Sequence, residues 1–167
     1  MAQKYKIKLV NEAHRKKYKG NSQNITLRSS WERDFFQMLM ENPKVLSFSS
    51  EEVIIPYYFS CDKKMHRYYM DFWFKIQKEN GDIKEYLLEV KPFAQTQKPV
   101  KNSKRKSSEL KYRREMFTYM KNLSKWQAAV NYCKNKGWEF MMLTDGRASI
   151  KKYKLWHWTE IGLPFEK

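Results

Sequence analysis

The sequence has few residues that could form covalent or metal cross-links. Its two cysteines, Cys61 and Cys133, lie far apart and outside any Cys-x-x-Cys motif, which is typical of reduced thiols in a cytosolic protein rather than of a disulfide. The three histidines are scattered and do not form a zinc-binding pattern. We find no signal peptide, no apolar run of membrane-spanning length and no internal repeat, so we expect no membrane partner.

Negative charge is also scarce. The 167 residues carry 18 Asp and Glu against 34 Lys and Arg, a formal net charge of +16. This imbalance predicts an anionic partner, with nucleic acid ahead of an anionic membrane. The length fits one domain with a normal core, and the aromatic content of 16% argues against disorder.

Residues 67–91 form the stretch around which the chain is organised. Two strand-like runs, 67–74 and 85–91, flank a polar turn and predict a β-hairpin. Because side chains alternate along a strand, one set of positions faces a core, namely Phe72, Phe74, Leu88 and Val90.

The register of this hairpin decides which polar residues share a face. A two-residue turn would set Asp71 opposite Val90. The alternative is a three-residue loop over 79–81, with Gly81 in the left-handed conformation and a bulge. This loop sets Asp71 opposite Glu89, and it is the arrangement that we predict.

Asp71, Glu89 and Lys91 then share the face opposite the apolar set. Two carboxylates and a lysine beside apolar neighbours are costly to bury unless they bind something, such as a divalent cation and a phosphate. Mg²⁺ held by carboxylates and water suits phosphodiester hydrolysis, and the carbonyl of Val90 could add a ligand. Lys91 could orient the attacking water or stabilise the charge that develops on the phosphate.

A helix is expected over 30–41, capped by Ser29 or Ser30 and ended by Asn42-Pro43. Its Glu32 has two interpretations. It is the N3 residue of a capping box if Ser29 is the cap, or it points to the acidic cluster of the hairpin. Local sequence favours the capping interpretation.

The other segments predict a mixed α/β sandwich with helices against a small sheet. Short strands are expected over 45–48 and 53–59, and a buried strand over 138–144. Two helices are expected between them, one over 109–121 and one that opens at Ser124 with a second capping box. The expected elements are completed by Gly137 as the C-terminal cap of that second helix.

Three segments flank or interrupt this pattern. Residues 1–24 form a basic arm, interpreted either as a solvated or partly ordered segment or as a contact to nucleic-acid phosphates. Residues 92–108 form a basic linker, interpreted either as a flexible loop or as a DNA-backbone clamp. We therefore divide the chain into an arm (1–24), a catalytic domain (25–146) and a tail of unknown role (147–167).

Glu32, Asp71 and the run Glu89-Val90-Lys91 resemble the PD-(D/E)xK nuclease superfamily, although Met70 stands where proline is usual. A wider similarity, over roughly residues 15–145, is to the head-completion proteins of T4-like tailed phages. The segments that carry it are 16–20, 28–32, 49–57, 66–72, 88–92, 125–129 and 137–140. Segment 28–32 also resembles the endonuclease subunit of Tn7-type transposition.

The resemblance implies a restriction-endonuclease-like core, a small mixed β-sheet flanked by α-helices. It implies an Mg²⁺-dependent deoxyribonuclease, with Mn²⁺ as a substitute, in which a glutamate of the first helix joins the metal site. The catalytic set is then Glu32, Asp71, Glu89 and Lys91. The metal ligands are Glu32, Asp71, Glu89 and the carbonyl of Val90.

The implied role is trimming the ends of packaged double-stranded DNA before the tail attaches, with phage head or portal proteins as partners. The implied location is the host cytoplasm during phage assembly, and the virion. The predicted DNA contacts are Lys16, Lys17, Lys19, Arg28, Lys98, Lys101, Lys104, Arg105 and Lys106. The alternatives are a non-catalytic protein of the head vertex that grips DNA, and a restriction- or transposition-type endonuclease. Oligomeric state stays open.

Overall fold

The computed structural model describes residues 4–101, 106–145 and 154–157. The strands are β1 (Tyr5–Ile7), β2 (Ile25–Leu27), β3 (Val45–Ser50), β4 (Ile54–Phe59), β5 (Lys64–Tyr69), β6 (Phe72–Gln77), β7 (Ile83–Val90), β8 (Glu139–Thr144) and β9 (Lys154–His157). The helices are α1 (Glu12–Lys17), α2 (Ser30–Glu41), α3 (Phe93–Thr96) and α4 (Lys106–Lys136). Within these ranges no helix has the length and apolar character needed to cross a membrane.

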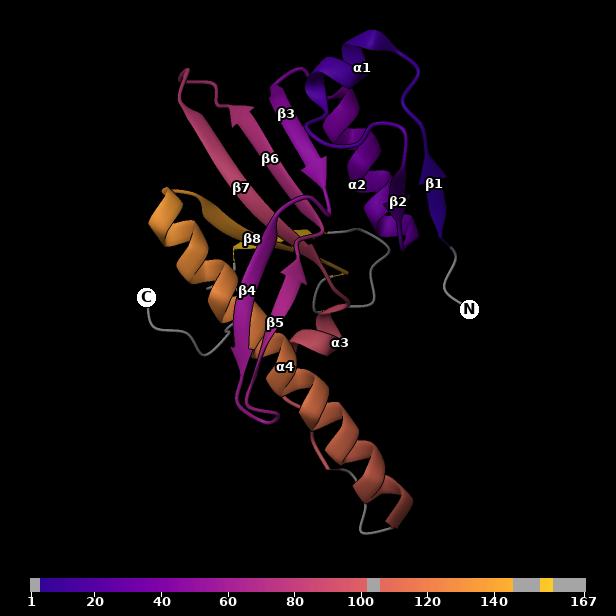
Figure 1. Ribbon diagram of the computed structural model, residues 1–167, viewed down its shortest axis with the longest axis vertical. Helices are drawn as coiled ribbons and strands as arrows, with labels where there is room; N and C mark the ends of the chain where they lie inside the picture. The colour runs from indigo at the N-terminus through magenta and orange to yellow at the C-terminus, as the bar shows by residue number, and fades with distance from the viewer. Residues whose placement is uncertain (1–3, 102–105, 146–153, 158–167) are drawn as a thin grey trace.

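A five-stranded sheet forms the centre of the molecule, with strand order β3-β6-β7-β8-β9. Strands β7 and β8 run parallel, and the other neighbours are antiparallel. Two further ribbons, β1–β2 and β4–β5, stand apart from this sheet, and the second of them lies beside helix α4 (Figure 1). The mixed sheet flanked by helices confirms the predicted fold class.

Each face of the central sheet has its own core. Leu88 and Val90 of β7 pack on one side with helix α2 and the β1–β2 ribbon. Leu87 points to the other side, where it packs with Trp126 of α4 and the inner face of the β4–β5 ribbon. Because side chains alternate along β7, Glu89 lies on the same side as Leu87, facing α4.

The hairpin β6–β7 has the predicted register, since Phe72 pairs with Leu88 and Gln77 with Ile83. Gly81 has a φ of 88°. The N–H of Lys78 donates to the carbonyl of Asp82 (2.8 Å), and the N–H of Gly81 donates to the carbonyl of Lys78 (3.0 Å). Gly81 and Asp82 therefore both lie opposite Lys78, which confirms the three-residue loop with its bulge.

The run 67–74, predicted as one strand, is two strands in different sheets. Strand β5 ends at Tyr69 and β6 begins at Phe72, so the chain changes sheet at Met70-Asp71. Met70 is fully buried, its N–H donates to the carbonyl of Val53 (3.0 Å), and its carbonyl accepts from the N–H of Glu51 (3.1 Å). Burial of Met70 and these bonds to 51–53 turn the chain there, so strand propensity alone could not place the break.

The predicted cap of α2 is confirmed, because the Oγ of Ser29 accepts from the N–H of Glu32 (3.1 Å). The predicted division of 109–136 into two helices is wrong, because α4 is one helix of 31 residues. Ser124 opens no capping box; its hydroxyl donates to the carbonyl of Met120 (3.2 Å), which lets serine sit inside a helix. Gly137, with a φ of 70°, ends α4 as predicted.

Residues 4–24 are ordered, which agrees with the partly ordered form of the first interpretation and not with a fully solvated arm. Strand β1 pairs with β2, and both Leu9 and Tyr18 are buried against α2. Part of the predicted linker is also ordered, as the helix α3, where the N–H of Phe93 donates to Asp145 (2.7 Å). In the tail, β9 adds an edge strand to the sheet. The division of the chain at residues 24 and 146 stays a prediction.

Candidate active site

Asp71 sits where the chain passes from the β4–β5 ribbon to the central sheet. Its Oδ2 accepts a hydrogen bond from the N–H of Val90 (2.7 Å). The β6–β7 ladder ends at the pair Phe72–Leu88. Beyond it, the side chain of Asp71 accepts the Val90 N–H in place of a backbone carbonyl. This bond fixes the carboxylate beside the end of β7, next to Glu89.

Glu89 is only 2% exposed, and both of its carboxylate oxygens have partners. The hydroxyl of Tyr68 donates to Oε2 (2.6 Å), and the ammonium of Lys91 lies 2.9 Å from Oε1. Tyr68 belongs to β5, so the second ribbon supplies the donor that orients the glutamate. The N–H of Lys91 donates to the carbonyl of Leu143 (3.0 Å), which fixes the lysine backbone beside β8.

The two carboxylates act strongly on each other and on the lysine. Burial raises the pKa of Asp71 well above its ordinary value, and the charge of Glu89 raises it further, although Lys91 and the N–H of Val90 oppose both. Burial alone would lower the pKa of Lys91, but the charges of Glu89 and Asp71 outweigh it and raise that pKa to about 12. Lys91 is therefore charged at neutral pH.

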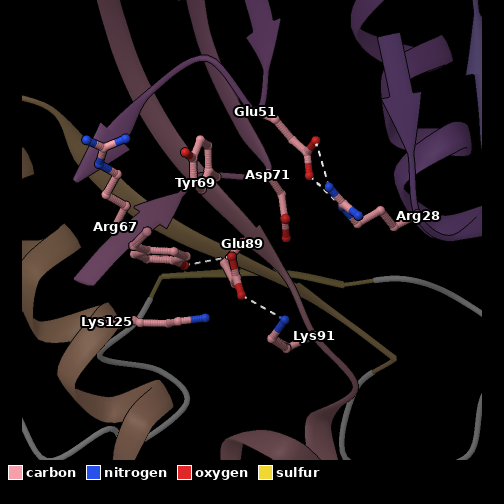
Figure 2. A pocket seen from close by; sticks show the side chains of 9 residues that line it. Arg28, Glu51, Arg67, Tyr69, Asp71, Glu89, Lys91 and Lys125 are labelled. Atoms are coloured by element: carbon pink, nitrogen blue, oxygen red, sulfur yellow. Dashed lines mark hydrogen bonds and ion pairs between the residues drawn. The ribbon is translucent and has the colours of Figure 1, made fainter. Parts of the chain in front are cut away.

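These groups face an open cavity of about 440 Å³ (Figure 2). Its cationic lining consists of Arg28, Arg67, Lys91 and Lys125. The rest of the lining is Glu51, Asp71, Glu89, Tyr68 and Tyr69. Figure 2 shows Asp71, Glu89 and Lys91 converging on one point, with Lys125 entering from α4 opposite Lys91.

The donor set fits a hard divalent cation. Asp71 and Glu89 offer two carboxylates to the cavity, while its third, Glu51, is paired with Arg28. Two carboxylates suit Mg²⁺, because this ion keeps several waters and takes one or two carboxylates together with substrate phosphates. Across the described residues no group of three or more His, Cys, Asp or Glu side chains is arranged to hold a metal ion. Water and phosphate would therefore supply the remaining ligands.

Glu32 lies in the first turn of α2, the helix that packs on the face of the sheet opposite to α4. It is 8% exposed, and its carboxylate accepts from the N–H of Arg28 (2.8 Å) and from the hydroxyl of Ser29 (2.9 Å). The Glu32 carboxylate thus accepts a backbone N–H, as the capping interpretation requires, but this N–H belongs to Arg28 and not to Ser29. Glu32 does not line the cavity, although its charge contributes to the raised pKa of Asp71. Its role in metal binding stays a prediction.

The predicted DNA contacts are dispersed. Arg28 lines the cavity, where it forms a two-point ion pair with Glu51 (2.7 and 3.2 Å). Lys17 donates to the carbonyls of Met40 and Asn42 (2.9 and 2.7 Å) and so binds the C-terminal end of α2. The DNA-binding role of each of these residues stays a prediction.

The remaining predicted contacts lie on the surface or outside the described residues. Lys16 pairs with Glu12 across one helical turn (3.0 Å), and Lys19 donates to the carbonyl of Lys16 (3.0 Å). Lys101 pairs with Glu109, and Lys98 is exposed. Lys106 opens α4, whereas Lys104 and Arg105 lie outside the described residues.

Five cavity residues were not predicted as part of the site: Tyr68, Tyr69, Arg67, Lys125 and Glu51. The first three belong to β5, which leaves the central sheet, so hairpin alternation could not place them. Lys125 had a signal in the sequence. It precedes Ala129 by four residues, on the buried side of α4, where a lysine is unusual without a polar site.

Comparison with known proteins agrees with this geometry. The family described as TnsA-like endonuclease N terminal matches residues 42–145, a range that contains Asp71, Glu89 and Lys91 but not Glu32. The head completion nuclease of enterobacteria phage T4 is 36% identical over 130 residues, which span 77% of this chain and 84% of that protein. No solved structure matches the chain significantly. The resemblances to the head-completion proteins of T4-like phages and to the Tn7-type endonuclease subunit are confirmed. The chain belongs to the family of TnsA-like endonucleases, with a restriction-endonuclease-like fold.

Proposed function

We propose that this protein is a metal-dependent endonuclease that cuts double-stranded DNA during completion of a phage head, trimming the ends of packaged DNA before the tail attaches. One observation carries the proposal: Asp71 and Glu89 converge beside a charged Lys91 in a cavity open to solvent. The name of the T4 relative supports the biological setting.

The proposed cofactor is Mg²⁺, with Mn²⁺ as a substitute, held by Asp71, Glu89 and the carbonyl of Val90. When bound, the ion activates water for attack and neutralises charge on the scissile phosphate. Glu32 is a further candidate ligand through an intervening water. The observation behind this assignment is that Asp71 and Glu89 line the same cavity, with Asp71 bound to the N–H of Val90, the residue after Glu89. A divalent cation held there would offset the unfavourable effect of the Glu89 charge on an ionised Asp71.

The chain's own residues divide the remaining work. Lys91 keeps its charge near neutral pH and stabilises the negative charge that grows on the phosphate. Its ion pair with Glu89 sets the position of the ammonium. Arg28 and Lys125 enter the cavity from different elements, so they are placed to hold phosphates on either side of the one that is cut.

Head or portal proteins are the proposed partners beyond DNA. The proposed location is the host cytoplasm during assembly, and afterwards the virion. The alternative is a protein that only grips DNA at the head vertex. Lysine and arginine are sufficient to bind DNA without cutting it. Burying two carboxylates together destabilises the fold, so their presence favours a catalytic role over a grip alone.

The test is incubation of the pure protein with linear and circular duplex DNA, with Mg²⁺ or with a chelator. We expect cleavage only with the metal, and we expect Lys91→Gln to lower the rate about 100- to 1,000-fold. Glutamine keeps a donor for Glu89, so the variant should fold. The control is Lys84→Gln, since Lys84 pairs with Glu139 and does not line the cavity. Normal cleavage by a correctly folded Lys91→Gln variant would show that Lys91 is not part of the catalytic site. If the wild-type protein cleaved no DNA, the alternative of a protein that only grips DNA would be favoured.

A further inference from the structure

The outer face of the β4–β5 ribbon is apolar and exposed. The strands pair Ile54 with Tyr69, Pro56 with Arg67, and Tyr58 with Met65. The four largest apolar side chains of these pairs are 45–63% exposed, namely Ile54, Tyr58, Met65 and Tyr69. The alternate residues of the ribbon, such as Ile55 and Tyr68, are buried against α4. The exposed set therefore belongs to one face by register, and we call it the outer ribbon face.

This face continues directly into the candidate active site. Arg67 and Tyr69 belong to both the outer ribbon face and the lining of the cavity (Figure 2). Tyr69 is two residues from Asp71. No ion pair or hydrogen bond involves the guanidinium of Arg67 among the described residues. A strand of DNA that leaves the cavity on this side would meet Tyr69 first and then Arg67.

We infer that the outer ribbon face is a stacking platform for unpaired bases of the substrate strand next to the cut. This inference rests on the proposed function and specifies its substrate class: DNA with an unpaired segment beside the cleaved bond. Aromatic side chains interleaved with cations are the combination that single-strand binders use, because every base offers a ring face to stack. Bases inside a duplex are already stacked on each other and cannot reach such a surface.

The chemistry of the face favours DNA over a protein partner. The six paired residues include no carboxylate, and their one charge is that of Arg67, in the central pair. A phosphate bound to Arg67 would place its bases near the flanking tyrosines. Along β4, Ile54 and Tyr58 are four residues apart, so the face is about 14 Å long. That length fits about two to four nucleotides, depending on how far the strand is stretched.

The test compares a blunt duplex with duplexes that carry an unpaired arm of one to six nucleotides. Affinity is measured by fluorescence anisotropy in chelator, and cleavage is measured with Mg²⁺. We expect Tyr69→Ala to reduce the preference for armed over blunt DNA about tenfold from the shortest arm onwards. Tyr58→Ala should reduce it only for arms longer than about two nucleotides, because Tyr58 lies at the far end of the face. Tyr69→Phe keeps the ring and should keep the preference.

The matched control is Ile83→Ala, since Ile83 is 54% exposed and lies at the start of β7, away from the ribbon. Circular dichroism checks that each variant folds. Equal losses on blunt and armed DNA, or unchanged preference in both tyrosine variants, would overturn the inference and leave the face to a protein partner. Wild-type protein that binds armed DNA but cuts nothing would instead count against the proposed nuclease and leave the platform standing.

Discussion

Tyr68→Phe isolates one hydrogen bond at the centre of the site. The phenol of Tyr68 donates to Oε2 of Glu89 at 2.6 Å, and both residues are buried. Phenylalanine keeps the ring that packs against Tyr57, so the change removes the donor and little else. A buried hydrogen bond to a charged group contributes about 1.5–3 kcal/mol. We therefore expect the free energy of unfolding to fall by about that amount, or the melting temperature by about 3–12 °C.

The same substitution should weaken metal binding. Groups that orient a ligand from outside the coordination sphere typically change metal affinity about 10- to 100-fold. Cleavage by Tyr68→Phe should accordingly need about 10- to 100-fold more Mg²⁺ and approach the wild-type rate at saturation. A purely structural hydroxyl would lower stability without moving the Mg²⁺ dependence, so the two measurements separate the roles.

The control is Tyr57→Phe in the adjacent strand β4. Tyr57 is 3% exposed, as is Tyr68, but its hydroxyl has no hydrogen bond among the described residues. It should change stability by less than about 0.5 kcal/mol and leave the Mg²⁺ dependence unchanged. If Tyr68→Phe matched this control in both assays, the hydroxyl would not orient Glu89.

Three further outcomes are expected. The folded-state pKa of Asp71 is raised, so its contribution to stability is present at low pH and is lost as pH rises through that pKa. Removing the metal with a chelator should therefore lower the melting temperature more at pH 8 than at pH 5. Equal shifts at the two pH values would contradict the repulsion between the carboxylates of Asp71 and Glu89. Glu32→Gln should change stability by no more than about 1 kcal/mol, because it keeps an acceptor for the N–H of Arg28. If Glu32 also helps to hold the metal, this variant should lose activity at low Mg²⁺ and recover it partly at high Mg²⁺; full activity at low Mg²⁺ would reduce Glu32 to a helix cap. Finally, DNA affinity should fall steeply with salt, with a log–log slope of about −4 to −5 if about five phosphates are neutralised, whereas a flat dependence would mean that the +16 charge serves another partner.

Local patterns predicted the parts of the structure that local physics controls. The hairpin register followed from Gly81 and the three-residue loop, and it placed Asp71 and Glu89 together. The start of α2 followed from the ability of Ser29 to accept a backbone N–H, and the end of α4 from Gly137. In each case a short segment has one favourable solution, and the rest of the fold agrees with it.

Features that depend on distant contacts were not predicted. Strands β5 and β6 were predicted as one strand, because no residue pattern in 67–74 indicates that the backbone of Met70 forms hydrogen bonds with the segment 51–53. Helix α4 was predicted as two helices, because Ser124 has the sequence pattern of a helix cap. The hydrogen bond from its hydroxyl to the carbonyl of Met120 could not be predicted from the sequence. Three of the missed cavity residues follow from the first of these errors, since Arg67, Tyr68 and Tyr69 belong to β5.

The different positions of the two cysteines make the protein ready for site-specific labelling without engineering. Cys61 is exposed in the turn between β4 and β5, at the far end of the ribbon from the cavity. Cys133 is buried in α4, and burial raises the pKa of its thiol to about 12, so it stays protonated and unreactive near neutral pH. A thiol-reactive dye added to the native protein should therefore attach at one known point, beside Tyr58 and Met65, and report by its emission when a strand of DNA lies across the ribbon.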